Sequence, residues 1–107
     1  MEEFVRKILS KYPSFTAEKQ MYERWLSMRE NPEVREALAL VDMKVAMIQS
    51  WFGLLNTDER FVIEKHLIEG LEWPRISFSF TELWKGEFTR SERTLVAYQA
   101  NGINKII

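Results

Sequence analysis

A repeat of apolar residues between positions 32 and 52 restricts the fold of this chain more than any other feature. Apolar side chains recur there at steps of four, three, four, three and four residues, at Val34, Leu38, Val41, Val45, Ile48 and Phe52. This spacing places them on one stripe of an α-helix. A second apolar stripe lies beside the first, at Leu40, Met43, Met47 and Trp51. A helix that is apolar over so wide an arc must be covered on more than one side.

Two arrangements satisfy this requirement. In the first, the helices that precede residue 32 wrap around the long helix, which then forms the core of a small helical domain. In the second, the stripe pairs with the same stripe of a second copy and forms the seam of a homodimer. The interface residues of that dimer would be Val34, Leu38, Val41, Val45 and Ile48. Three heptads are too few to choose between the two arrangements.

Two shorter helices are predicted before the long one. Residues 2–12 and 17–30 both carry apolar side chains at helical spacing. Pro13 is predicted to end the first helix and Thr16 to cap the second, so that the residues between them form a connector. Asn31-Pro32 is a strong start signal for the long helix, because Asn caps well and Pro fits the first helical position.

Three more helices are predicted after the long one. Thr57 as N-cap and Gly70 as terminator enclose the first of them. Its acidic residues, which are predicted to form a solvated face, are Asp58, Glu59, Glu64 and Glu69. Pro74 begins the second helix, and Ser91 caps the last one, at about residues 91–106.

The chain is therefore predicted to be all-α. A three-helix segment, residues 1–54, is followed by a helix-turn-helix of three helices in residues 55–107. The absence of Cys and the single histidine, His66, leave no set of ligands for a metal ion. No Ser/His/Asp arrangement and no glycine-rich phosphate loop is visible, so neither an enzyme nor a bound cofactor is predicted.

The sequence also predicts a cytoplasmic location and no membrane partner. No apolar run approaches the roughly 20 residues that span a bilayer. The chain begins with Met1-Glu2-Glu3, which is acidic, whereas the first part of a signal peptide is basic.

Three short motifs in residues 55–107 resemble those of a known group of proteins. The motifs are Leu55-x4-Arg60-x-Val62-Ile63, Ile68-x-Gly70-x-x-Trp73-x-x-Ile76 and Ser91-Glu92-Arg93-Thr94-Leu95. Together they resemble the helix-turn-helix of sigma-factor region 4, in the form found in small phage and prophage regulators of the ArpU and RinA kind. The resemblance implies a DNA-binding transcriptional regulator in a bacterial host cell, with the last helix reading the DNA.

One stretch departs from the motifs of that group. Ile76 and Leu95 are 19 residues apart, which is longer than a compact reader of this type needs. The extra residues, about 80–88, are apolar and aromatic. They either lengthen the helix that begins at Pro74 or displace the last helix.

The predicted DNA contacts lie mainly on the outer side of the last helix. Arg90 and Arg93 stand three residues apart at its N-terminal end, where a guanidinium group can reach guanine O6 and N7 or clamp a phosphate. The other candidates are Thr94, Ala97 and Asn101 on the same helix, with Lys105 and Arg75 for flanking phosphates. The alternative is that all of these residues form the solvated face of an ordinary amphipathic helix.

The predicted partner is double-stranded DNA, bound by a homodimer, with RNA polymerase as a second candidate partner. The charge distribution keeps other functions open. Residues 55–88 carry four basic and seven acidic side chains, whereas residues 89–107 carry three basic and one acidic. An acidic scaffold suits a protein of the same fold that binds a host or phage protein, such as a polymerase or a nuclease, in place of DNA. A phage DNA-packaging component is a further alternative.

Overall fold

The computed structural model describes residues 1–83 and 91–107, and most of that part of the chain is helical. The elements follow in the order α1 (Glu2–Ser10), α2 (Tyr12–Met28), α3 (Pro32–Phe52), α4 (Thr57–Ile63), the π-helical turn η1 (Glu64–Ile68), α5 (Trp73–Leu83) and α6 (Glu92–Ile106). No strand occurs among the described residues, and the predicted all-α fold is confirmed.

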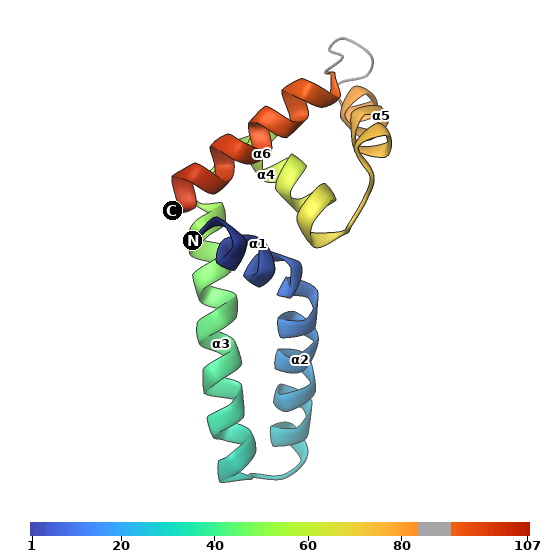
Figure 1. Ribbon diagram of the computed structural model, residues 1–107. Helices are drawn as coiled ribbons and strands as arrows, with labels where there is room; N and C mark the ends of the chain where they lie inside the picture. The colour runs from blue at the N-terminus through green and yellow to red at the C-terminus, as the bar shows by residue number, and fades with distance from the viewer. Residues whose placement is uncertain (84–90) are drawn as a thin grey trace.

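α2 and α3 form a long antiparallel hairpin that projects from the other helices (Figure 1). The molecule is elongated as a result, with extents of 52 × 29 × 20 Å. The predicted start of α3 is confirmed. The side-chain oxygen of Asn31 accepts hydrogen bonds from the backbone N–H groups of Glu33 and Val34, at 2.9 and 3.3 Å, and Pro32 lies in the first turn. These bonds satisfy N–H groups that have no partner within the helix, so the chain reverses over a short turn.

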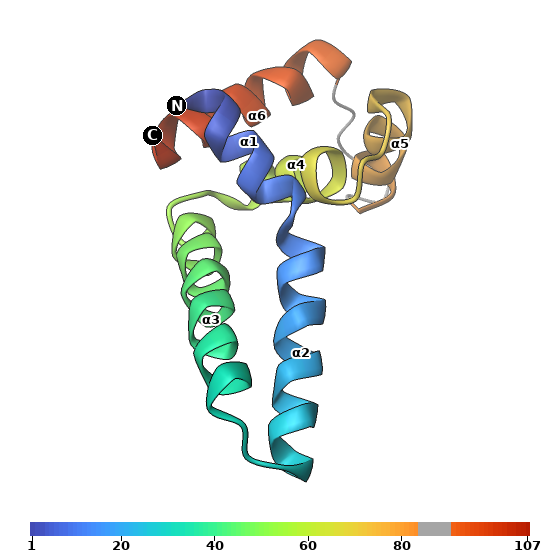
Figure 2. The same ribbon diagram turned by 60° about the horizontal axis from the view of Figure 1, so that its bottom comes forward.

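The remaining helices form a head at one end of the hairpin. α4 and α6 pack along each other, α5 contacts α6 and η1, and α1 lies across the junction (Figure 2). α1 contacts α2, η1 and α6, so it ties the head to the hairpin. The two ends of the chain lie close together at this junction (Figures 1 and 2).

The larger of two apolar clusters fills the junction between hairpin and head. Its buried members are Val5, Leu9, Phe15, Val41, Val45, Ile48, Phe52, Ile63 and Ile103. They come from the N-terminal helices and from α4 and α6, so the core crosses the predicted boundary between residues 54 and 55. Burial of this kind is the main favourable term in folding, and here it joins the two segments.

The apolar stripe of α3, for which a dimer seam was one of the two predicted roles, packs against helices of the same chain. Val41, Val45 and Ile48 are at most 3% exposed, and they pack against α1 and α2 residues of the same cluster. Leu38 is half-buried against that cluster, and Val34 is half-buried near the tip of the hairpin. The first predicted arrangement, in which the preceding helices cover α3, therefore describes this stripe.

The second cluster lies inside the head and joins α4, α5 and α6. Its buried members are Val62, Ile76, Phe80 and Leu95. The rings of Phe61 and Phe80 meet edge to face with their centroids 5.7 Å apart, a favoured aromatic geometry. Each of the three helices therefore contributes buried side chains to one shared cluster.

Two helix starts differ from the prediction. α2 begins at Tyr12, because Pro13 occupies its first turn, where the missing N–H of proline is not needed. Thr16 is consequently inside α2, and its hydroxyl donates to the carbonyl oxygen of Pro13 at 2.9 Å. The N-cap of α4 is Asn56, and the predicted cap, Thr57, is the first helical residue.

The helix predicted between Thr57 and Gly70 also changes its winding. α4 ends at Ile63, and the chain continues as the π-helical turn η1, in which the N–H of Glu69 donates to the carbonyl oxygen of Glu64 at 2.9 Å. Gly70 then stops the helix as predicted, with a φ of 73° that L side chains rarely adopt. The wider turn holds one extra residue per turn, so side chains after Ile63 point in directions that a regular helix would not give.

Within the described residues, no helix combines the length and the apolar character needed to cross a membrane.

Candidate nucleic-acid interface

The buried side of α6 fixes the position of the whole helix. Ser91 caps it as predicted, with its hydroxyl accepting from the N–H of Thr94 at 3.2 Å. Four buried residues follow at helical spacing and face α4 and α5, namely Leu95, Gln99, Gly102 and Ile103. One side of α6 is therefore buried against the rest of the molecule.

The opposite side of α6 is open to solvent and almost free of large side chains. Its exposed residues are Arg93, Val96, Ala97, Ala100, Asn101 and Asn104. No acidic residue follows Glu92, so this surface carries no charge that would repel a phosphate. Small and polar side chains on an exposed helix allow its backbone to approach a flat or grooved partner closely.

The predicted contact residues fall into three groups. Arg93, Ala97 and Asn101 lie together on the exposed side of α6, at steps of four residues. Thr94 is half-buried, and its hydroxyl lies 3.0 Å from that of Ser91, so it belongs to the helix cap. Arg75 is exposed on α5, away from α6 in the chain. Arg90 and most of the stretch 80–88 lie outside the described residues.

Lys105 is held by an acidic residue of α4. Its Nζ lies 2.7 Å from Oε1 of Glu59, and the side chains are 45% and 4% exposed respectively. The same carboxylate oxygen accepts the backbone N–H of Asn56 at 3.0 Å, while Asn56 Oδ1 accepts the N–H of Glu59 at 2.8 Å. Glu59 therefore completes a capping box and anchors α6 at once. The prediction that it lies on a solvated face was wrong.

Gly102 allows α6 to approach α4 closely. A Cβ atom at this position would lie 2.6 Å from Cδ1 of Ile63, and 3.4 Å from atoms of Glu59 and Leu55. Ile63 is fully buried, so its side chain has little room to move aside. The close approach and the Glu59–Lys105 ion pair act on the same turn of α6.

His66, on the π-helical turn, provides a third connection to α6. Its Nδ1 lies 2.6 Å from the side-chain oxygen of Gln99, which is 3% exposed. Because a carbonyl oxygen can only accept, the proton of this hydrogen bond belongs to His66. The imidazole also stacks on the ring of Trp73, with centroids 3.9 Å apart and planes inclined by 24°. His66 thus joins α6 to the start of α5.

The cations of the head divide into paired and unpaired groups. On α4 and η1, Arg60 pairs with Glu64 at 2.8 Å and Lys65 pairs with Glu69 at 3.1 Å. Lys105 is paired as described. Arg75 and Arg93 form no ion pair with any residue that the structure describes. An unpaired, exposed guanidinium can bind a phosphate or a base without first breaking an internal contact.

The Glu59 anchor, the close approach at Gly102 and the His66–Gln99 bond were not predicted from the sequence. One signal for the first was present, because Asn56 precedes Glu59 by three residues, the spacing of a capping box. The described residues also contain no group of three or more His, Asp or Glu side chains that could hold a metal ion.

Comparison of the chain with protein-family models, with curated proteins and with solved structures gave no match.

Proposed function

We propose that this chain is a small DNA-binding transcriptional regulator whose helix α6 enters the major groove. The observation that carries the proposal is the exposed side of α6. It presents near the N-terminal end one arginine, Arg93, that has no ion pair among the described residues. Small residues follow in the middle, then the amides of Asn101 and Asn104, and no acidic side chain occurs after Glu92. The arginine can bind guanine in a bidentate manner, and an asparagine amide can bind adenine or the backbone.

The packing of the head supports the same function. A reading helix must be held rigidly, because a shift of its axis moves every base contact together. α6 is held by the apolar cluster around Leu95, by the Glu59–Lys105 ion pair and by the hydrogen bond from His66 to Gln99. The resemblance of residues 55–107 to regulators of the ArpU and RinA kind implies the same role for this helix.

A protein partner is the second candidate, and one observation favours it. The cations of α4 and η1 are neutralised by acids one turn further along, so that part of the head offers a phosphate no free positive charge. A negatively charged scaffold suits a basic protein surface better than it suits DNA. The DNA proposal therefore depends heavily on Arg93 and Arg75.

Fluorescence anisotropy with the full chain tests the proposal. The probes are overlapping duplexes from the region upstream of its own gene and one duplex of scrambled sequence. We expect binding that weakens steeply with added salt and that prefers one native duplex. Arg93→Ala should lower the affinity for that duplex by about 1–3 kcal/mol, roughly 5- to 150-fold.

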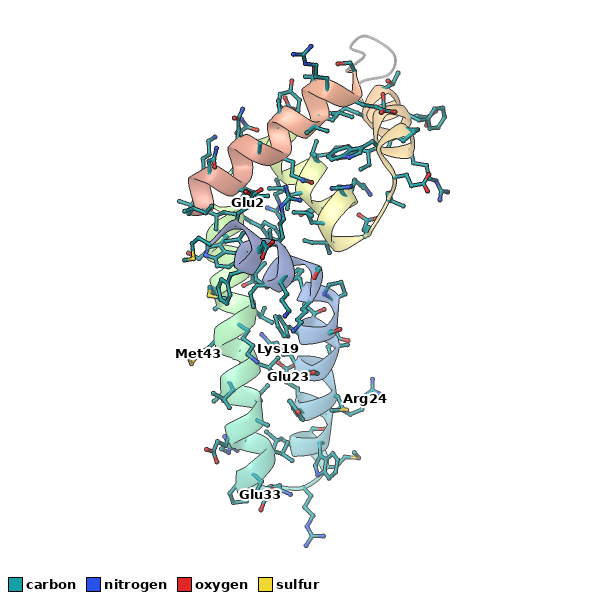
Figure 3. The ribbon with its side chains drawn as sticks, viewed as in Figure 1. Glu2, Lys19, Glu23, Arg24, Glu33 and Met43 are labelled. Carbon is teal, nitrogen blue, oxygen red and sulfur yellow. The ribbon has the colours of Figure 1, made fainter. Side chains whose placement is uncertain are left out.

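Arg24→Ala is the matched control, since it removes the same charge from a different part of the molecule. Arg24 is exposed and projects from α2 away from α3, at a distance from the head (Figure 3). Equal losses for the two variants would show non-specific attraction and contradict a reading role for α6. Absence of binding to every duplex at low salt would refute DNA binding altogether.

A further inference from the structure

The hairpin carries an unusual set of exposed apolar side chains. Met21, Trp25 and Met28 of α2 are 51%, 49% and 77% exposed, and Leu40 and Met43 of α3 are 57% and 70% exposed. Within each helix they follow at steps of three or four residues, so each set forms a stripe. Scattered apolar residues on a surface are ordinary, whereas two neighbouring stripes mark a surface that is normally covered.

Helix geometry places the two stripes on one side of the hairpin. Tyr22 and Leu26 mark the side of α2 that faces α3. At roughly 100° per residue, Trp25 lies about 90° around α2 from that side. On α3, Leu40 lies about 120° from the buried stripe, in the same rotational sense. Because the two helices are antiparallel, turning in the same sense around each of them, starting from the side that faces the other helix, leads to the same side of the hairpin. Met43 projects sideways at its edge, and Lys19 lies nearer the space between the helices (Figure 3). We call the side that carries Met21, Trp25, Met28 and Leu40 the hairpin face.

Four exposed charges lie on the same face, in two pairs of opposite sign. Glu18 of α2 and Lys44 of α3 lie at the end near the head, and Arg29 and Glu33 lie at the tip. Helix geometry places Lys44 on the same side of the buried stripe as Leu40, and its Nζ stands 5.2 Å from the ring centre of Phe15 of α2. At each end of the hairpin face, then, one helix contributes an acid and the other a base.

We propose that the hairpin face binds a second copy of this chain, so that two hairpins form a four-helix bundle. The charges are self-complementary under two-fold symmetry. With the axis along the hairpin, Glu18 meets the partner's Lys44; with the axis across it, Glu18 meets the partner's Arg29. Lys44 then meets the partner's Glu18 in the first case and the partner's Glu33 in the second. A surface that complements itself in this way is what an isologous dimer requires.

The area of the hairpin face is sufficient for such a dimer. A 17-residue helix is about 25 Å long, and two helices packed side by side are about 18–20 Å wide. Covering a corrugated surface of this size buries about 700 Å² on each copy, or about 1,400 Å² in total, which is within the usual range for stable protein pairs. Trp25, Leu40 and the two methionines of α2 supply the apolar centre that such interfaces need.

This dimer differs from the one predicted from the sequence, because it uses the second stripe of α3 and leaves the buried stripe inside the chain. It does not depend on DNA binding by α6. Its test is made without DNA, so failure of this proposal and failure of the proposed function can be distinguished.

The test is sedimentation velocity of the full chain over a wide micromolar range. We expect the mass to rise from the monomer value of 12.8 kDa to twice that value as concentration increases. Leu40→Glu places a charge in the centre of the face and should raise the dimer dissociation constant by at least about tenfold. Lys44→Glu should raise it by about two- to tenfold, since it sets two acids opposite each other under either symmetry axis.

Ala46→Glu is the matched control, since Ala46 is an exposed residue of α3 about 120° around the helix from Leu40. It should leave the dissociation constant within about twofold of the parent value. Circular dichroism of each variant confirms that the helices are retained. A chain that stays at 12.8 kDa at all concentrations overturns the proposal, and so does equal weakening by Leu40→Glu and Ala46→Glu.

Discussion

Replacing Lys105 by methionine should destabilise the fold, because this lysine is the charged partner of a buried carboxylate. Met keeps most of the length and apolar volume of the side chain and removes the ammonium group. Glu59 would retain one hydrogen bond, from the backbone N–H of Asn56 at 3.0 Å. Its side chain is only 4% exposed, so water cannot replace the lost partner.

The size of the effect follows from the unequal exposure of the two side chains. Removing one partner of a fully buried ion pair costs about 3–5 kcal/mol. Exposed pairs contribute about 0.2–1 kcal/mol. The Lys105 side chain is 45% exposed while that of Glu59 is buried, so we expect an intermediate loss of about 2 kcal/mol. In urea this should lower the unfolding midpoint by about 1 M.

A double-mutant cycle with Glu59→Gln isolates the pair. The glutamine keeps an oxygen that can accept from Asn56, so in its presence Lys105→Met should cost less than about 0.5 kcal/mol. Lys11→Met, at an exposed lysine, is the control and should change stability by less than about 0.5 kcal/mol. Equal effects of Lys105→Met in both backgrounds, or an effect no larger than that of Lys11→Met, would refute this account of Glu59.

Two further changes test other parts of the head by urea unfolding. Gly102→Val should lower the free energy of unfolding by about 1–3 kcal/mol, because its first added carbon would lie 2.6 Å from Ile63 Cδ1. The control, Ala100→Val on the exposed side of α6, should cost well under about 1 kcal/mol. Similar losses for the two variants would mean that the close approach is unimportant. Asn56→Ala should cost about 1–2 kcal/mol through loss of the capping box, and Thr57→Ala should be nearly neutral; a larger effect of Thr57→Ala would restore the cap predicted from the sequence.

The features predicted correctly from the sequence are those that depend on neighbours along the chain. Helical spacing and the signals Asn31-Pro32, Gly70 and Ser91 act within a few residues, and the structure confirms all of them. Pro13 shows the limit of such signals, because proline both ends helices and begins them. Here Pro13 lies at the beginning of a helix, and the burial of Phe15 explains why. A helix that starts at Tyr12 turns the ring of Phe15 into the core.

Features that depend on contacts distant in the sequence were not predicted. Nothing near Glu59 reveals that Lys105, 46 residues later, lies against it. The tight packing at Gly102 could not be predicted either. The sequence around a glycine in a helix does not show whether that glycine is exposed or faces a neighbouring helix. The two candidate roles of the α3 stripe could not be distinguished for the same reason, since its spacing is identical whether the helices that cover it belong to the same chain or to another.

The position of α6 in both apolar clusters links the two proposals physically. Leu95 belongs to the cluster of the head, and Ile103, two turns later, belongs to the cluster that includes the base of the hairpin. A hairpin dimer therefore brings two α6 helices into one assembly, because the cluster that contains Ile103 also contains buried residues of α2 and α3. Losing the dimer should remove only the gain in DNA affinity that comes from two linked sites, while each head still binds a half-site. Leu40→Glu should thus weaken binding to a two-site duplex but not to a half-site, whereas Arg93→Ala should weaken both and leave the mass of the protein unchanged.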